Sequence, residues 1–438
     1  MKFEEGAANE LQTLLEQFEN PWSSVDFKEA MAFVRDDNNM VFNEGNRFSF
    51  FPSSRFALKV FKQNALKAGV ISKNEVAACP EKIVFEFNSE RDRYLARDEV
   101  MMMDIVANND WKRGIYFSSS RGSSFSIALL SAGYVKQVGM AYELSPIKEE
   151  PIFFNLSKMK KNLLKTYEYG AMNNPNVLTD YYARRHTQQY RVNFLLLAEQ
   201  LLNKGDKKGA SELLDKSLEL MPLENVLDFG EVNQIDPMNS LKINSAHTNF
   251  MYQGQDVKAK TSGCLHEYVQ LYFMAGKKEK ATSLGMKLAD NYETIFNYFE
   301  HSDAIYTGNP ENAEDLYAAL DGCFKMYVIA NDSEYGGKNG KLAKRLYKLI
   351  NHVYQGVMPR VYNELQQEAS DAGESASSIE GGTYFMSMIS GLQVNLGAMG
   401  EHYGFLKSSG NQAPNNSEPD AMDLENLIKE DTTSDTIR

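Results

Sequence analysis

The sequence predicts an α+β domain followed by an all-α domain of helical pairs, so that the chain is predominantly helical overall. Short apolar or alternating runs, typical of strands, are confined to about the first 150 residues. Beyond about residue 155 the apolar residues recur at the helical period, and one helical pair is followed by a second of the same pattern. We therefore expect a mixed α/β domain over residues 1–150, a helical repeat domain over 151–405 and a disordered acidic tail over 406–438.

The first domain is expected to hold a small sheet covered by a few helices. Leucines and a phenylalanine on one side of residues 4–18 predict an amphipathic helix, and Asp26 is expected to cap a second helix that runs to Val34. The remaining patterns predict strands at 56–60, 83–87 and 115–117, helices at 101–106 and 123–130, and a strand-rich segment at 134–144. The order of the strands does not follow from these patterns.

The helical part begins with a pair over residues 190–222 that matches the 34-residue tetratricopeptide pattern. Small residues at Ala198 and Ala210 allow the two helices to approach closely, Gly205 makes the turn and Pro222 ends the second helix. The other pattern positions fall on Phe194, Leu197, Leu201, Leu214 and Ser217.

A second copy of the pattern begins near Ser262, and its glycine, Gly276, follows Gly205 by 71 residues, about two repeat lengths. Its other positions are Leu265, Tyr268, Tyr272, Ala281 and Leu288. The sequence further predicts a loop-bearing insertion at 226–260, a third helical pair at 313–330 and 341–366, a linker at 368–382 and a last helix at 385–403.

Composition limits the classes of partner and chemistry. The net charge of −13 argues against nucleic acid and against an anionic membrane surface, because both need basic patches. The three cysteines lie far apart without the spacing of a zinc or redox site, and the six histidines form no metal-binding motif. We therefore expect no metal and no cofactor. The sequence shows no catalytic motif that would indicate an enzyme.

Two places combine aromatic and basic residues in a way that suits partner binding. Trp111 and Arg113 could form a platform for a sugar or a phosphate, or Trp111 could anchor a turn between a helix and the sheet. The second place could bind an acidic peptide terminus or a glycan on a repeat surface, or form an ion-paired seam between the domains. Its residues are Tyr181, Tyr182, Arg184, Arg185 and Arg191.

Three sequence segments carry a resemblance to a known family. They are RDEVMMMDIVANNDWKRGIYF at 97–117, RFSFFPS at 47–53, and GAMNNP at 170–175 followed by DYYARR at 180–185. Together they resemble the soluble C-terminal region of a family of multi-pass membrane proteins from Bacteroidota. That family is related to protein O-mannosyltransferases and is known as domain of unknown function 2723. The resemblance covers roughly residues 2–222 well and the rest loosely.

The resemblance implies that the chain is the extracytoplasmic, non-catalytic region of a membrane glycosyltransferase, at the periplasmic face of the inner membrane. Its partners would be the membrane half of the same polypeptide and a protein or glycoprotein acceptor, bound through the repeat surface. The longest uncharged run, residues 381–400, holds too many glycines and polar residues to predict a membrane span, so we expect the membrane helices to precede this region. A stand-alone envelope scaffold for protein–protein interaction remains the alternative. An independent hydrolase would need a nucleophile and a base that the sequence does not display.

Overall fold

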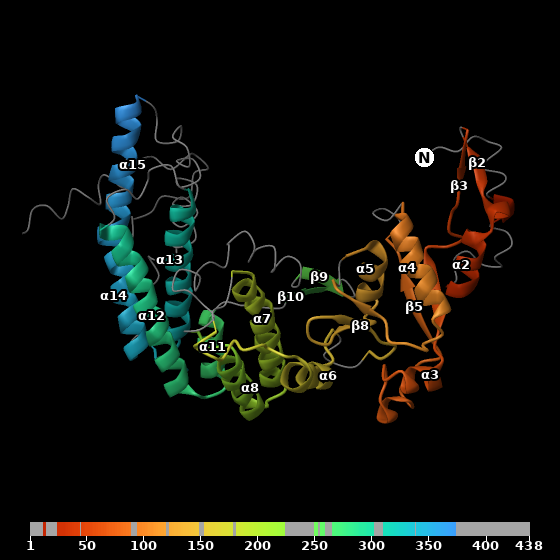
Figure 1. Cartoon of the computed structure of the whole chain (residues 1–438), viewed down its shortest axis with the longest axis horizontal. Helices are drawn as coiled ribbons and strands as arrows, with labels where there is room; N and C mark the ends of the chain where they lie inside the picture. The colour runs from red at the N-terminus through yellow and green to blue at the C-terminus, as the bar shows by residue number, and fades with distance from the viewer. Residues whose placement is uncertain are drawn as a thin grey trace, which may run out of the picture. The chain divides into compact units, whose positions relative to one another are not determined.

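The computed structural model describes the chain in segments and divides it into two compact units that meet in sequence between Glu168 and Tyr169. The described residues are 12–14, 24–43, 45–88, 94–119, 122–148, 153–177, 181–223, 249–252, 255–258, 265–301, 310–337 and 339–373. The first unit is a mixed α/β fold and the second is helical, as the sequence predicts (Figure 1).

The first sheet of the first unit has the strand order β1-β4-β5, with β4 in the centre. Strand β1 (Val25–Asp26) runs parallel to β4 (Arg55–Lys59), and β5 (Lys82–Glu86) runs antiparallel to it. The expected strands at 56–60 and 83–87 are confirmed to within a residue. Their alternation places Phe56, Leu58, Ile83 and Phe85 on one face, where all four side chains are buried.

Helix α2 (Phe27–Arg35) follows β1 directly and covers that apolar face. The carboxylate of Asp26 accepts hydrogen bonds from the backbone N–H groups of Lys28 (2.9 Å) and Glu29 (3.1 Å), which confirms the predicted N-cap. A short hairpin comes next, β2 (Val41–Asn43) and β3 (Asn46–Phe48), followed after β4 by α3 (Lys62–Lys67). Helix α4 (Arg97–Asn108) packs beside α2.

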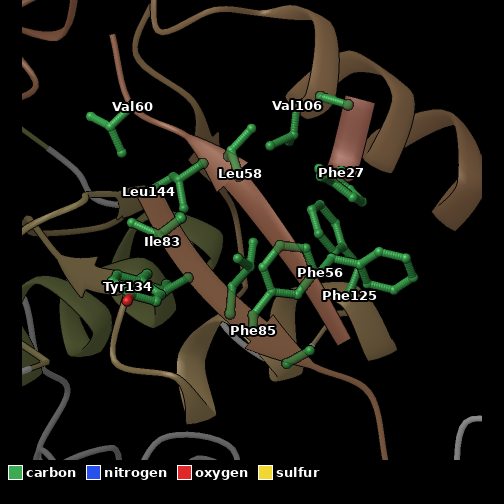
Figure 2. Packing of buried hydrophobic residues seen from close by; sticks show 14 of the residues in the cluster. Phe27, Phe56, Leu58, Val60, Ile83, Phe85, Val106, Phe125, Tyr134 and Leu144 are labelled. Carbon is green, nitrogen blue, oxygen red and sulfur yellow. The ribbon is translucent and has the colours of Figure 1, made fainter. Parts of the chain in front are cut away.

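The centre of this unit is a group of aromatic rings. Phe27, Phe56, Phe85 and Phe125 come from α2, β4, β5 and α5 (Ser124–Ser131), and each is at most 2% exposed (Figure 2). The rings of Phe27 and Phe85 meet edge to face with centroids 5.1 Å apart, and those of Phe27 and Phe125 stack at 5.8 Å. Edge-to-face and offset geometries of this kind are the favoured ones for aromatic pairs.

A second sheet has the order β6-β8-β7, and all of its pairs are antiparallel. It consists of β6 (Tyr116–Phe117), β7 (Val135–Gln137) and β8 (Tyr142–Leu144), which confirms the strand-rich segment expected at 134–144. Helix α6 (Leu156–Lys161) continues into a π-helical turn (Asn162–Thr166) and completes the first stretch of this unit.

The insertion expected at 226–260 contributes a hairpin that its polar composition did not predict. Strands β9 (Asn249–Tyr252) and β10 (Gln255–Lys258) pair antiparallel, and this segment belongs to the first unit rather than to the helical one. A four-residue strand is too short to give a clear alternation against a polar background.

The second unit is built from helical pairs. Helix α7 (Tyr181–Asn203) turns at Gly205, whose φ of +82° lies in the left-handed region, into α8 (Lys207–Leu220). The second pair repeats the arrangement, with α11 (Leu265–Met274), Gly276 at φ +76° and α12 (Lys278–His301). Helix α11 packs against both α7 and α8, so the two pairs are neighbours in space.

The third pair consists of α13 (Pro310–Asn331) and α14 (Lys341–His352), which continues through a π-helical turn (Val353–Val357) into α15 (Met358–Ala372). Because α15 ends at Ala372, the segment expected as a linker from residue 368 begins as helix. The expected helix at 385–403 and tail at 406–438 lie outside the described residues, as does most of the helix expected at 4–18. Among the described residues, no helix is both long and apolar enough to cross a membrane.

Candidate functional site

The turn between α4 and β6 has the most unusual backbone among the described residues. Asp110 and Trp111 both have positive φ, 49° and 59°, and they are the non-glycine residues recorded in that region of conformational space. A left-handed conformation costs a non-glycine residue about 1–2 kcal/mol. Two in succession therefore need surrounding contacts that fix the turn, and such outliers are a reason to examine a site for function.

Contacts from two helices and from the turn itself hold Asp110. Its carboxylate accepts hydrogen bonds from the ammonium groups of Lys28 on α2 (3.1 Å) and Lys112 (2.9 Å), and its carbonyl accepts one from Asn64 on α3 (2.9 Å). The bond from Lys112, followed by that from Lys28, lowers the pKa of Asp110 below its ordinary value. The carboxylate is thus an ionised anchor at pH 7.

Trp111 fixes the other half of the turn. Its ring is 4% exposed, and Nε1 donates a hydrogen bond to the carbonyl of Lys59 at the end of β4 (2.9 Å). Asn109 closes the turn by donating from Nδ2 to the carbonyl of Arg113 (2.7 Å). Of the two alternatives for this segment, the geometry favours a tryptophan that anchors a helix–strand turn to the sheet.

The turn offers little room for a ligand beneath it. The cavity under Trp111 and Arg113 has a volume of about 10 Å³, which is space for about one water molecule. On the outside the turn presents positive charge, since Arg113 is exposed and the side chains of Lys28 and Lys112 are 53% and 66% exposed. Binding at this place would therefore be on the surface and would favour an acidic group.

A second polar cluster, which the sequence did not indicate, lies at the second sheet. Glu143 on β8 is fully buried, and its carboxylate accepts bonds from Lys158 Nζ on α6 (2.7 and 2.8 Å) and from the Tyr116 hydroxyl on β6 (3.0 Å). Lys158 also donates to the carbonyls of Gly69 (2.8 Å) and Val70 (3.1 Å). Burial and the charge of Glu143 raise the pKa of Tyr116 to about 12.

These residues resemble an acid–base set in type, but their geometry is that of a structural tie. The bonds from Lys158 to two carbonyls and a carboxylate account for its three N–H donors. Glu143 has no solvent-exposed surface. The cluster joins α6 to β6, β8 and the turn after α3, and its buried carboxylate is closed to a substrate.

The aromatic and basic segment of the second unit occupies the beginning of α7. Tyr181, Tyr182, Arg184 and Arg185 lie in its first turns, and their side chains are outside the described residues. Arg191 is only 2% exposed, and its Nη2 donates to the carbonyl of Met221 at the end of α8 (2.7 Å). The buried side chain of Arg191 therefore connects α7 to the end of α8.

Polar contacts also connect the first helical pair to the second. The hydroxyls of Ser217 on α8 and Tyr268 on α11 are 2.6 Å apart, and both side chains are buried. Asp215 on α8 accepts bonds from the hydroxyl of Tyr272 (2.9 Å) and from Lys280 (2.6 Å). Burial raises the pKa of both tyrosines, with Asp215 contributing at Tyr272. Positions that the repeat pattern assigns to packing thus also carry hydrogen bonds.

Fold and site together define a mixed α/β unit and a unit of helical pairs whose polar clusters are structural ties. Within the described part of the chain, no group of three histidine, cysteine, aspartate or glutamate residues is placed to hold a metal ion.

Residues 1–163 match the family described as TMEM260-associated domain 2. Neither a curated protein nor a solved structure matches the chain. The match ends within the first unit and agrees with the coarser part of the resemblance, a region of a TMEM260-like membrane protein, TMEM260 being related to O-mannosyltransferases.

Proposed function

We propose that this chain is the non-catalytic, extracytoplasmic region of a membrane protein related to protein O-mannosyltransferases, and that its helical unit binds the acceptor protein or glycoprotein. The observation that carries the proposal is the match of residues 1–163 to the TMEM260-associated domain. The sequence resemblance at 97–117, which lies within the matched residues, supports the assignment of this region to such a protein. The region would lie at the periplasmic face of the inner membrane of a Bacteroidota cell.

The division of labour follows from the two units. The α/β unit, which carries the family match, would contact the membrane half of the polypeptide. The helical pairs, with the tetratricopeptide pattern at 190–222, would supply the surface for the acceptor. Catalysis would belong to the membrane half, since the polar clusters described in this chain are structural ties.

Two experiments test the two parts of the proposal. Reading the gene in frame upstream of the codon for Met1 tests the membrane context: several encoded transmembrane helices support it. Their absence favours the alternative, a stand-alone envelope scaffold for protein–protein interaction.

The acceptor surface is tested by capture from a Bacteroidota envelope extract, with mass spectrometry of the retained proteins and glycans. Tyr182→Ala/Arg185→Glu should lose secreted glycoproteins or their precursors that the wild type retains. Lys208→Glu is the matched control, because Lys208 is an exposed cation on α8, outside the proposed segment. Equal retention by all three proteins removes α7 as the acceptor surface.

A further inference from the structure

Strand β5 leaves one side of its backbone without a partner in the described structure. It lies at the end of the order β1-β4-β5 and pairs only with β4 there. Backbone bonds from Phe87 to Ser54 and from Val60 to Glu81 show which residues face β4. Because direction alternates along a strand, Ile83 and Phe85 also point their main-chain groups at β4, whereas Lys82, Val84 and Glu86 point theirs to the open side.

The side chains of this edge are not those of a buried strand. Ile83 and Phe85 point into the hydrophobic core, Phe85 toward the phenylalanine rings and Ile83 beside Leu144, as Figure 2 shows. Lys82 and Glu86 are exposed, and Val84 between them is half-buried. No hydrogen bond is recorded among the described residues for the outward N–H and C=O groups of these three. An unpaired edge with this composition is a template for strand addition.

We propose that a second copy of the chain fills this edge, with β5 pairing antiparallel to β5 of the other copy about a twofold axis at Val84. In this register Lys82 faces Glu86 of the other copy, Val84 faces Val84, and Glu86 faces Lys82. The segment Lys-Ile-Val-Phe-Glu is therefore complementary to itself in charge. Opposite charges directly across an antiparallel pair stabilise it.

The backbone supports the same register. Lys82, Val84 and Glu86 direct their main-chain N–H and C=O groups to the open side. In the proposed register these same residues lie opposite one another, so each facing pair is a hydrogen-bonded pair. Three pairs with two bonds each give about six intermolecular bonds. A shift of two residues keeps only two such pairs within β5 and sets Lys82 against Val84. A parallel arrangement would instead set like charges near one another. The proposal concerns the assembly of the first unit and does not depend on the proposed function.

Charge reversal tests the interface by the oligomeric state of the full chain, measured by sedimentation velocity over a concentration series. The wild type should show a reversible monomer–dimer equilibrium. Lys82→Glu and Glu86→Lys should each shift it to monomer, because each sets like charges across the axis. The double variant should recover the dimer. Folding is not at risk in Lys82→Glu, since Lys82 lies across from Lys59 on β4 and the change places a carboxylate beside that lysine.

A crosslink tests the register itself. Hydrogen-bonded antiparallel partners have Cα atoms about 5.5 Å apart, but their Cβ atoms are farther apart than an unstrained disulfide allows. Val84→Cys should therefore form a covalent dimer with a short bismaleimide crosslinker, while Lys82→Cys, which faces Glu86, should not. The wild type controls for Cys79, Cys264 and Cys323.

A chain that stays monomeric at all concentrations overturns the proposal. A dimer whose monomer–dimer equilibrium is unchanged in both Lys82→Glu and Glu86→Lys also overturns it, because that dimer must use another surface. Lys73→Glu serves as the matched control, since Lys73 is exposed on the same unit and is not part of β5. Its dimerisation should equal that of the wild type, and an equal loss in this variant would also overturn the assignment.

Discussion

Replacing Lys158 by methionine is expected to destabilise the first unit by about 3 kcal/mol. The change leaves the fully buried carboxylate of Glu143 with the hydroxyl of Tyr116 as the remaining donor of the three contacts described. Removing one partner of a buried ion pair costs about 3–5 kcal/mol. The Lys158 side chain is 29% exposed, so water can replace part of what is lost, and the expectation falls at the lower end of that range.

The assay is urea and thermal unfolding followed by tryptophan fluorescence. Trp111 is buried in the first unit, so its signal reports on that unit. At about 2–4 °C per kcal/mol for a unit of this size, the loss corresponds to a fall of about 6–12 °C in Tm. Lys160→Met is the matched control on the same helix, because Lys160 is exposed, and it should stay within about 0.5 kcal/mol of the wild type.

The double variant Lys158→Met/Glu143→Gln separates the buried charge from the lost packing of α6. It removes the uncompensated charge, so it should be more stable than Lys158→Met alone. The reasoning is refuted if Lys158→Met costs less than about 1 kcal/mol, or if the double variant is the less stable of the two.

Three further results are expected. Trp111→Phe keeps an aromatic ring but loses the indole N–H and its bond to the carbonyl of Lys59, so it should lower the free energy of unfolding by about 1–3 kcal/mol in urea unfolding followed by circular dichroism. In a spectrophotometric tyrosine titration, Tyr116→Phe should remove a group that ionises near pH 12. Because the folded state raises that pKa above about 10, the contribution of Tyr116 is complete below pH 10 and is lost toward pH 12. Gly205→Ala should cost about 1–2 kcal/mol by circular dichroism melting, through backbone strain alone, because an added Cβ meets no atom within 4 Å; an unchanged melt would show that the turn relaxes.

Local patterns predicted the elements of this fold well where one physical cause dominated. Asp26 caps α2 because a side-chain carboxylate three residues or fewer from free N–H groups has a single favourable geometry. Gly205 and Gly276 mark the helical turns because the chain there needs a positive φ. These features depend on neighbours in sequence, and so they can be read from it.

The contacts that the sequence did not reveal come from distant segments. Glu143 stands in a strand where alternation would turn it to solvent, yet Tyr142, Glu143 and Leu144 are all buried. The strand is covered on both faces, and α6 supplies Lys158 to the side that alternation predicts as wet. Arg191 was expected on a binding surface or in an ion-paired seam, and the structure adds a bond from its side chain to a carbonyl thirty residues further along the chain. No local pattern carries that information.

The residue types in segment 97–117, which carries the strongest family signature, can be explained by their contribution to the stability of the fold. Asn109, Asp110 and Trp111 each make a contact that fixes the strained turn, and two of these contacts reach other elements, at Lys59 and at Lys28. A sequence that must keep such a turn has to keep these residue types whatever the protein binds. The signature can therefore identify the fold without marking the binding surface. It follows that partner binding in this unit should be sought first at Arg113, which is exposed beside the turn, because exchange of Lys112 would also remove a bond to Asp110.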